Sequence, residues 1–289
     1  MSNARLVHRD SLRPKLIALS VAACFSLSAS QSSANPTGGT VSSGSASFAA
    51  SGNTLTITNT AGAIINWQSF SIGVNEITRF LQSSGSSAVL NRVVGRNGVV
   101  PQSVIDGILQ SNGRVFLLNS SGILIGAGAR IDVAGFVASS LNLSDQDFLA
   151  GKMRFTETPG AGKVSNAGTI DTSSAGPGGR VFLVGSDVEN SGIIRTPQGQ
   201  IILAAGKSAE LVSENTPFVT VNITADSEQA LNVGQLLADS GRIGMFGALV
   251  RQGGVAQRDR RGGAGGAGAE RERNGTGEDN ERETCGVHG

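Results

Sequence analysis

The sequence is poor in the residues that most often carry catalysis or build an aromatic core. It contains no Tyr, one Trp and two His, and aromatic residues make up 4% of its 289 residues. The histidines, His8 and His288, stand near opposite ends, which excludes a His-dependent triad or a His-based metal site in the body of the protein. A core of large rings is excluded as well. We therefore predict no catalytic residues, no metal site and no cofactor, and hence a protein that is not an enzyme.

The chain also lacks a large net charge and cysteines that could form a disulfide within its body. The 23 Lys and Arg and 22 Asp and Glu give a formal charge of +1, whereas neutralising nucleic-acid phosphates needs a clear basic excess. We expect no nucleic-acid partner. Cys24 and Cys285 lie too near the two ends to cross-link the body, so an oxidising periplasm cannot lock the chain prematurely. This suits a protein that crosses a second membrane unfolded.

The first 34 residues have the features of a secretion signal. Basic residues precede the apolar run Leu16–Leu27, which is well short of the about 20 residues of a membrane-spanning helix. Small residues at Ser32 and Ala34 predict cleavage between Ala34 and Asn35, and so a secreted or cell-surface protein. The alternative is lipidation at Cys24, because the residues before it loosely fit a lipobox.

The body of the chain repeats a short pattern. The motif N-x-G-x-[I/L] starts at Asn166, Asn190 and Asn232, and each copy is followed by Gly-[Arg/Gln]-[Val/Ile]. Uninterrupted copies are about 20 to 24 residues apart. Glycine is abundant, at 41 residues, about twice the usual ~7%. Such a period predicts a stacked repeat architecture.

Short β-branched runs lie between these Gly and Asn residues. They are too short for helices and are bounded by turn residues, which favours buried strands: Val115–Leu118, Ile123–Ile125, Val181–Val184 and Ile201–Leu203. We predict an all-β fold, a right-handed parallel β-helix (a single-stranded solenoid) whose coils pair at about 4.8 Å. Gly and Asn are expected at its corners, where positive φ is often needed, with identical residues stacked in ladders. An ordinary β-sandwich is the alternative.

Some segments depart from the coil pattern. Thr54–Thr58 alternates apolar and polar residues and is expected to lie across the open end of the stack as a cap. Ser144–Asp147 resembles a capping box and predicts a helix of one or two turns. Phe218–Thr224 alternates again and predicts a hairpin that leaves the coils, and Trp67 is expected to pack under the cap.

The last part of the chain has a different composition. Residues 256–289 mix charged residues with glycine, without an apolar period, which predicts a disordered low-complexity tail. The predicted domains are therefore a signal peptide (1–34), a β-helix (35–255) and this tail. Because the repeat is cut at Val250–Val255, where another coil would begin, we also hypothesise a truncated or frame-shifted copy of a longer protein.

Several segments, in order, carry a specific resemblance. The sequence resembles the N-terminal secretion domain of the filamentous haemagglutinin family, the large exoproteins of bacterial two-partner secretion, in the segments Asn35–Gly39, Ile65–Gly73, Ala88–Val93, Gly113–Ile123 and Phe136–Leu143. The resemblance covers roughly residues 35 to 254. It implies a β-helix with an N-terminal cap and extra-helical hairpins, exported by the general secretory route. It also implies recognition by an outer-membrane barrel transporter with periplasmic domains.

The resemblance also implies residues for partner recognition. The family signature Asn-Pro-Asn-Gly-Ile is here Asn119, Ser120, Ser121, Gly122 and Ile123, so the proline and second asparagine that favour a tight turn are replaced by serine. Either a simple coil corner or a recognition element fits this segment.

Asn91 and Arg92 are likewise either a capped turn and a solvated charge or a docking site. The expected function is that of an exported domain, associated with adhesion or haemagglutination, that its transporter recognises and that nucleates β-helix folding. We expect a monomer. The alternatives are a surface adhesin that binds a host glycan or protein directly and a β-helix polysaccharide lyase. The lyase is disfavoured because Asp132, Asp171 and Asp187 are isolated on turns.

Overall fold

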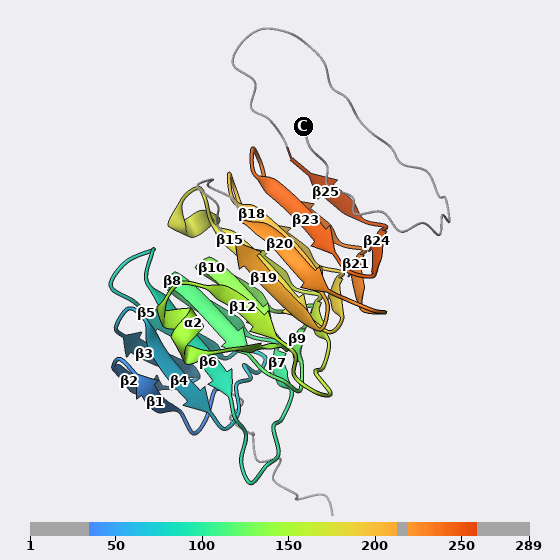
Figure 1. Ribbon diagram of the computed structural model, residues 1–289. Coiled ribbons are helices and arrows are strands. Elements are labelled where there is room, and N and C mark those ends of the chain that lie inside the picture. Colours follow the sequence, from blue (N-terminus) through green and yellow to red (C-terminus); the bar gives the residue numbers. More distant parts are fainter. Residues whose placement is uncertain (1–34, 213–218, 259–289) are drawn as a thin grey trace, which may run out of the picture. The chain divides into compact units, whose positions relative to one another are not determined.

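The computed structural model describes residues 35–212 and 219–258, and they fold almost entirely as strands. The predicted signal peptide, Cys24, Ala34, Phe218 and the tail from residue 259 lie outside the described residues. Most of the strands form successive coils with three faces, and within these coils each strand pairs in parallel with its equivalent in the neighbouring coil (Figure 1). The predicted parallel β-helix is confirmed.

The first and second faces belong to one continuous sheet, because two long strands bend from one face into the other. These are β8 (Ile108–Leu118) and β10 (Arg130–Ser139). Besides them, the first face holds β3 (Thr54–Asn59), β5 (Ile77–Leu81), β14 (Thr169–Asp171), β17 (Ile193–Arg195), β22 (Gln235–Leu237) and β25 (Val255–Gln257). The second face holds β4 (Ala63–Trp67), β6 (Ala88–Val93), β15 (Arg180–Gly185), β18 (Gln200–Ala205) and β23 (Arg242–Phe246).

The third face is a separate sheet of short strands. It consists of β7 (Ser103–Ile105), β9 (Ile123–Ile125), β13 (Val164–Asn166), β16 (Val188–Asn190), β21 (Gln229–Asn232) and β24 (Leu249–Gln252). The inward side chains of the three faces form the main core, which is mostly Ile, Val, Leu and Ala with a few Phe and the single Trp. The predicted aliphatic interior is therefore present.

The repeated motif has a direct structural explanation. Asn166, Asn190 and Asn232 are aligned in register and fully buried, and each side-chain Nδ2 donates to the Oδ1 of the next at 2.7 Å. The predicted ladder is confirmed. The glycine two residues later is required by close stacking, since a Cβ on Gly192 would lie 2.1 Å from the carbonyl oxygen of Gly168. These motif glycines do not have positive φ, unlike the turn glycines Gly122 and Gly178, and the tight approach of neighbouring coils selects them instead.

The ladder continues beyond the point where the sequence pattern breaks. Asn232 donates to Oε1 of Gln252 at 3.0 Å, and a Cβ on Gly254 would lie 2.1 Å from the carbonyl oxygen of Gly234. Strands β24 and β25 pair with the preceding coil up to Gln257. The expectation that the repeat is cut at Val250–Val255 was therefore wrong, because a glutamine takes the place of the ladder asparagine.

Two antiparallel strands cap the N-terminal end of the stack. These are β1 (Thr40–Ser43), which pairs with β4, and β2 (Ala46–Ser51), which pairs with β3. Trp67 lies beneath them as predicted, 2% exposed and edge-on to Phe48 of β2 at 5.4 Å. Strand β3 is itself a parallel rung against β5, so the placing of Thr54–Thr58 across the end was wrong. Alternation marks any half-buried strand and cannot separate a rung from a cap.

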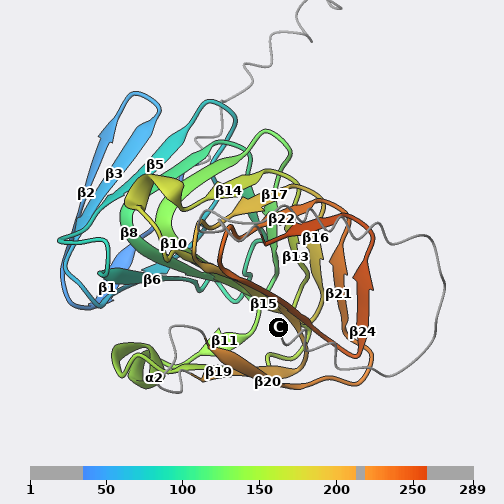
Figure 2. The same cartoon turned by 90° about the horizontal axis from the view of Figure 1, so that it is seen from above.

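An extra-helical layer covers the second face (Figure 2). Its antiparallel sheet holds β11 (Asn142–Leu143), β12 (Met153–Thr156), β19 (Ser208–Val212) and β20 (Thr220–Thr224), next to α2 (Asp145–Leu149). A short 3₁₀ helix, η1 (Ser173–Ala175), follows β14. The predicted short helix and extruded hairpin are confirmed. Because this layer packs on the second face, strands such as β18 are buried on both sides and read as unbroken apolar runs.

Candidate functional site

The two segments singled out by the resemblance meet at one edge of the second face. Strand β6 pairs in parallel with β8, which places Arg92 opposite Leu118, so Asn119 follows directly beside the end of β6. The chain between the two strands leaves as a loop over residues 94–101 and returns as β7. The fold therefore brings Asn91 and Arg92 next to the Asn119–Ile123 corner, although 25 or more residues separate them in sequence.

The Asn119–Ile123 corner forms a tight turn despite its serines. The Gly122 amide donates to the Asn119 carbonyl oxygen at 2.9 Å, and the Ser121 amide donates to Oδ1 of Asn119 at 3.0 Å. Gly122 has φ +95°, and a Cβ there would lie 2.7 Å from the carbonyl oxygen of Lys163. Asn119 supplies the local bonds of an Asx turn, which compensates for the missing proline. Ser120 is half-buried, and Ile123 packs in the main core with no exposed surface.

The Asn119–Ile123 corner also forms hydrogen bonds to the loop that precedes β7. Nδ2 of Asn119, which is 1% exposed, donates to the Pro101 carbonyl oxygen at 2.8 Å and to Oγ of Ser103 at 2.9 Å. The Ser121 hydroxyl donates to the Val100 carbonyl oxygen at 2.6 Å. The side chains of the motif are thus used to hold another segment of backbone, in addition to closing their own turn.

The loop itself is a small hairpin that the sequence reasoning missed. Arg96 and Val99 exchange backbone hydrogen bonds, both 3.0 Å long, around Asn97 and Gly98, which have φ values of 51° and 78°. Positive φ at both central residues is the type I′ geometry for which Asn-Gly is the preferred pair. The dipeptide Asn97-Gly98 between valines was the signal in the sequence that predicts this hairpin.

Asn91 lies inside the core, within strand β6 and not at a turn. It is fully buried, accepts a hydrogen bond from Nε1 of Trp67 at 2.9 Å, and donates to the Phe116 carbonyl oxygen at 3.2 Å. The interpretation of Asn91 as a capped turn was wrong. Its amide satisfies the indole N–H, which would otherwise be an unpaired donor in an apolar interior.

Arg92 points to the opposite side of the strand, toward the extra-helical layer. Its guanidinium lies 2.7 Å from a carboxylate oxygen of Asp145 and donates to the Leu143 carbonyl oxygen at 2.7 Å. The Arg92 side chain is 21% exposed, so the interpretation as a freely solvated charge was wrong. Arg92 connects β6 to the start of α2.

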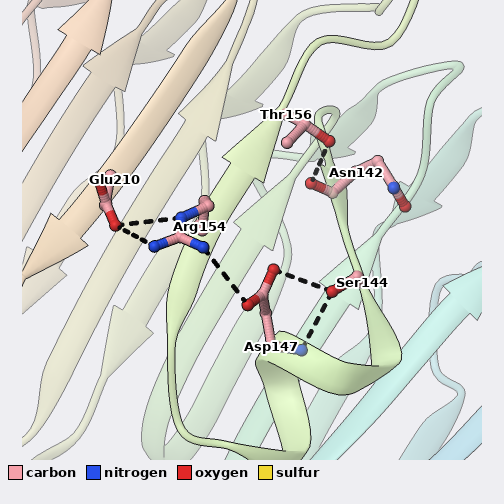
Figure 3. A network of polar contacts seen from close by, with 6 residues as sticks. All are labelled: Asn142, Ser144, Asp147, Arg154, Thr156 and Glu210. Carbon is pink, nitrogen blue, oxygen red and sulfur yellow. Dashed lines mark hydrogen bonds and ion pairs between the residues drawn. The ribbon is translucent and has the colours of Figure 1, made fainter.

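A polar network extends from α2 across the extra-helical sheet (Figure 3). Ser144 caps the helix by accepting from the Asp147 amide at 3.0 Å, and its hydroxyl donates to the Asp147 carboxylate at 2.9 Å. Arg154 donates to Glu210 at 2.9 and 3.1 Å and lies 3.9 Å from Asp147. The hydrogen bond to Glu210, followed by the attraction of the two carboxylates, raises the pKa of Arg154. Helix α2 is therefore held from the coil side and from the sheet side.

Within residues 35–212 and 219–258 no group of three or more His, Cys, Asp or Glu side chains is placed to hold a metal ion. In that same part of the chain, no helix is both long and apolar enough to cross a membrane. The site described above is built from turns, side-chain hydrogen bonds to backbone, ion pairs such as Arg92–Asp145, and apolar packing.

Comparison with known proteins gives a consistent result. The family model of the TPS secretion domain matches residues 32–261. A heme/hemopexin-binding protein of Haemophilus influenzae strain Rd is 35% identical over 176 residues, which is 59% of this chain and 19% of the relative. A second heme/hemopexin-binding protein of Haemophilus influenzae is 41% identical over 81 residues, 28% of this chain and 8% of that relative.

A solved structure is similar over most of the chain. The crystal structure of the HMW1 secretion domain from Haemophilus influenzae matches with a TM-score of 0.68 and 36% identity, covering 75% of this chain and 57% of the solved one. The chain thus spans less than a fifth of the curated relatives and just over half of the solved domain.

Proposed function

The chain belongs to the TPS secretion domain family, and from that premise we propose that an outer-membrane transporter with periplasmic domains recognises it during two-partner secretion. Proteins of this family are exported exoproteins, so the chain is part of a secreted protein that passes the outer membrane. The observation that carries the proposal is the family match over residues 32–261, together with the tight turn that Asn119–Ile123 still forms although two of its signature residues are serine.

In this proposal, the residues implied by the resemblance fix the shape of neighbouring segments and do not themselves form the contact with the transporter. Asn91, Asn119 and Ile123 are 0–1% exposed, which leaves them little surface to offer a partner. Asn119 and Ser121 hold the 94–101 loop, and Arg92 holds α2. We therefore assign these residues the task of fixing the surface that the transporter binds, and we place the contact itself on the segments that they hold.

Folding itself contributes to export in this proposal. In a solenoid, stability is approximately the sum of coil terms and nearest-neighbour terms, so each coil that emerges can dock on the one before it. Capped N-terminal coils would form first and template the rest, since β1 and β2 cover the end of the stack. Deleting residues 35–60 should abolish both secretion and β-structure. Secretion of the deletion variant at wild-type level would refute this order of folding.

The residue that follows the predicted cleavage site, Asn35, is bonded into the folded domain. Side-chain Nδ2 of Asn35 donates to the Asn53 carbonyl oxygen at 3.1 Å, and the Thr78 hydroxyl donates to Oδ1 of Asn35 at 2.9 Å. We propose that residues 1–34 are removed as a signal peptide, with cleavage between Ala34 and Asn35. Mass spectrometry of the secreted chain checks this, and an N-terminus at a lipidated Cys24 would contradict it.

A secretion assay tests the function as a whole. The full chain is produced in a Gram-negative host with and without a two-partner-secretion transporter, and the culture medium is measured for the chain. Release that depends on the transporter supports the proposal, and release without it contradicts it. Agglutination or glycan binding by the purified chain in the absence of transporter would favour direct adhesion instead. We propose no enzymatic activity, and we do not extend heme or hemopexin binding to this chain, which matches under a fifth of those relatives.

A further inference from the structure

The outward side of the second face carries a column of apolar side chains that the extra-helical layer covers (Figure 2). One residue from each of six neighbouring strands is aligned with the next, and all six are 0–7% exposed: Ile64, Leu90, Phe116, Val137, Phe182 and Ile202. The following strand, β23, has Gly244 at this position. Because apolar side chains stabilise a fold only while they are kept from water, the second face depends on the layer.

The layer is assembled from two parts that are far apart in the sequence. The first part, β11, α2 and β12, follows β10, and the second part, β19 and β20, follows β18. The strands between the two parts, β13 to β18, make two complete coils with one strand on each face. When the chain leaves the transporter from its N-terminus, β12 must therefore wait for two further coils before it can pair with β19.

Once formed, the layer joins strands that are more than one coil apart. Strand β12 pairs antiparallel with β19, and Figure 3 shows Arg154 bound to Glu210 across this pair. At its other end, Arg92 connects the start of α2 to β6. Stacking links only neighbouring coils, so the layer adds a connection that the repeated motif does not provide.

Gln200 attaches the second part of the layer to the coil beneath it. Gln200 is 3% exposed, and its side-chain Nε2 donates to the Val219 carbonyl oxygen at 2.8 Å while its Oε1 accepts from the Val219 amide at 2.9 Å. The aligned residues of the neighbouring strands are Arg180 and Arg242. Arginine has donors and no acceptor, so it could not form both bonds. The repeated Gly-[Arg/Gln]-[Val/Ile] motif therefore has its glutamine in the strand to which β20 is attached.

From these observations we infer that the extra-helical layer is a strap that closes late in export, and that Gln200 is the positioning residue that closes it. The inference rests on the proposed function, because it requires a chain that folds as it leaves a transporter. Coils that stack one at a time can also be lost one at a time from the end of the stack. After β19 has paired with β12 and Val219 has bound Gln200, the coils from β10 to β18 open only together. The folded part then no longer slides back into the transporter.

The first test measures amide hydrogen exchange of purified secreted chains by mass spectrometry. Gln200→Met removes both bonds to Val219 and keeps a side chain of similar length, and Gln235→Met is the matched control, because Gln235 is exposed on β22. We expect Gln200→Met to speed exchange at least about tenfold in β12, β19 and β20 alike, because two buried backbone groups lose their partners. The control should stay within about twofold of wild type.

The second test separates a late-closing strap from ordinary stabilisation. Asn190→Ala weakens the same coils through the ladder and leaves the strap intact. For an equal loss in the free energy of unfolding, Gln200→Met is expected to slow transporter-dependent release more than Asn190→Ala does. The retained chain should be cut by a protease added outside the cells. Arg154→Ala removes only the half-exposed link to Glu210, so it should keep the fold and slow release by less.

The outcomes separate the strap from the proposed function. If release of the wild-type chain requires the transporter but Gln200→Met leaves exchange in β12 unchanged, or slows release only as much as its stability loss does in Asn190→Ala, the strap is overturned and the function stands. If the wild-type chain is released without a transporter, the function falls, and the export role of the strap falls with it. If Gln200→Met does not fold, Arg154→Ala decides, and wild-type exchange in β19 with wild-type release would overturn the inference.

Discussion

The asparagine ladder allows a stability prediction that can be worked out from the structure. Replacing Asn190 by Ala removes its bonds to Asn166 and Asn232, both 2.7 Å long, and leaves a donor and an acceptor unpaired in the interior. An unsatisfied buried polar group costs about 1–3 kcal/mol, so two cost about 2–6 kcal/mol. This is a large share of the about 5–15 kcal/mol by which domains are usually stable.

The assay uses two signals in one urea titration. Far-UV circular dichroism reports all coils, whereas fluorescence reports the cap end, because Trp67 is the only tryptophan of the chain. Cooperativity can break down in repeat proteins. We therefore expect Asn190→Ala to lower the circular-dichroism midpoint strongly and the fluorescence midpoint less, since the coils beyond Asn190 unfold first.

The matched control is an asparagine outside the ladder. Asn222 lies exposed on β20, and its replacement by Ala should change the free energy of unfolding by less than about 0.5 kcal/mol. A loss below about 1 kcal/mol for Asn190→Ala would refute the reasoning, because the ladder bonds would then contribute no more than an ordinary surface contact.

Three further predictions concern the candidate site. Asn91→Ala leaves the Trp67 indole N–H unpaired and should cost about 1–3 kcal/mol, with a changed near-ultraviolet dichroism; an unchanged spectrum would contradict it. Arg92→Ala removes the contact with Asp145 and should cost about 1–2 kcal/mol, since the pair is partly exposed; it should also speed limited proteolysis around α2, and a wild-type cleavage pattern would count against it. Gly122→Ala places a Cβ against the next coil at positive φ and should cost more than about 1 kcal/mol and reduce secretion, whereas full secretion would show that the corner is dispensable.

The candidate site was predictable in part. Asn119, Gly122 and Ile123 form the corner that the signature implied, and the capping box at Ser144 forms the predicted cap. The hairpin at Asn97-Gly98 also has a local signal, the Asn-Gly dipeptide. By contrast, Asn91 gave no local sign of its bond to Trp67, 24 residues earlier, and Arg92 gave none of its contact with Asp145.

What the sequence determined by itself is the coil. The N-x-G-x-[I/L] period, the short aliphatic runs and the lack of rings are consequences of a narrow stacked interior, and each can be read within about 20 residues. Only the tertiary structure decided which strand caps the stack, which glycines are needed for close approach, and what the signature residues hold. Those properties depend on how segments outside the repeated motif align between coils, as Arg92 does opposite Leu118. This alignment pairs residues far apart in the chain, and outside the motif no repeated pattern announces it.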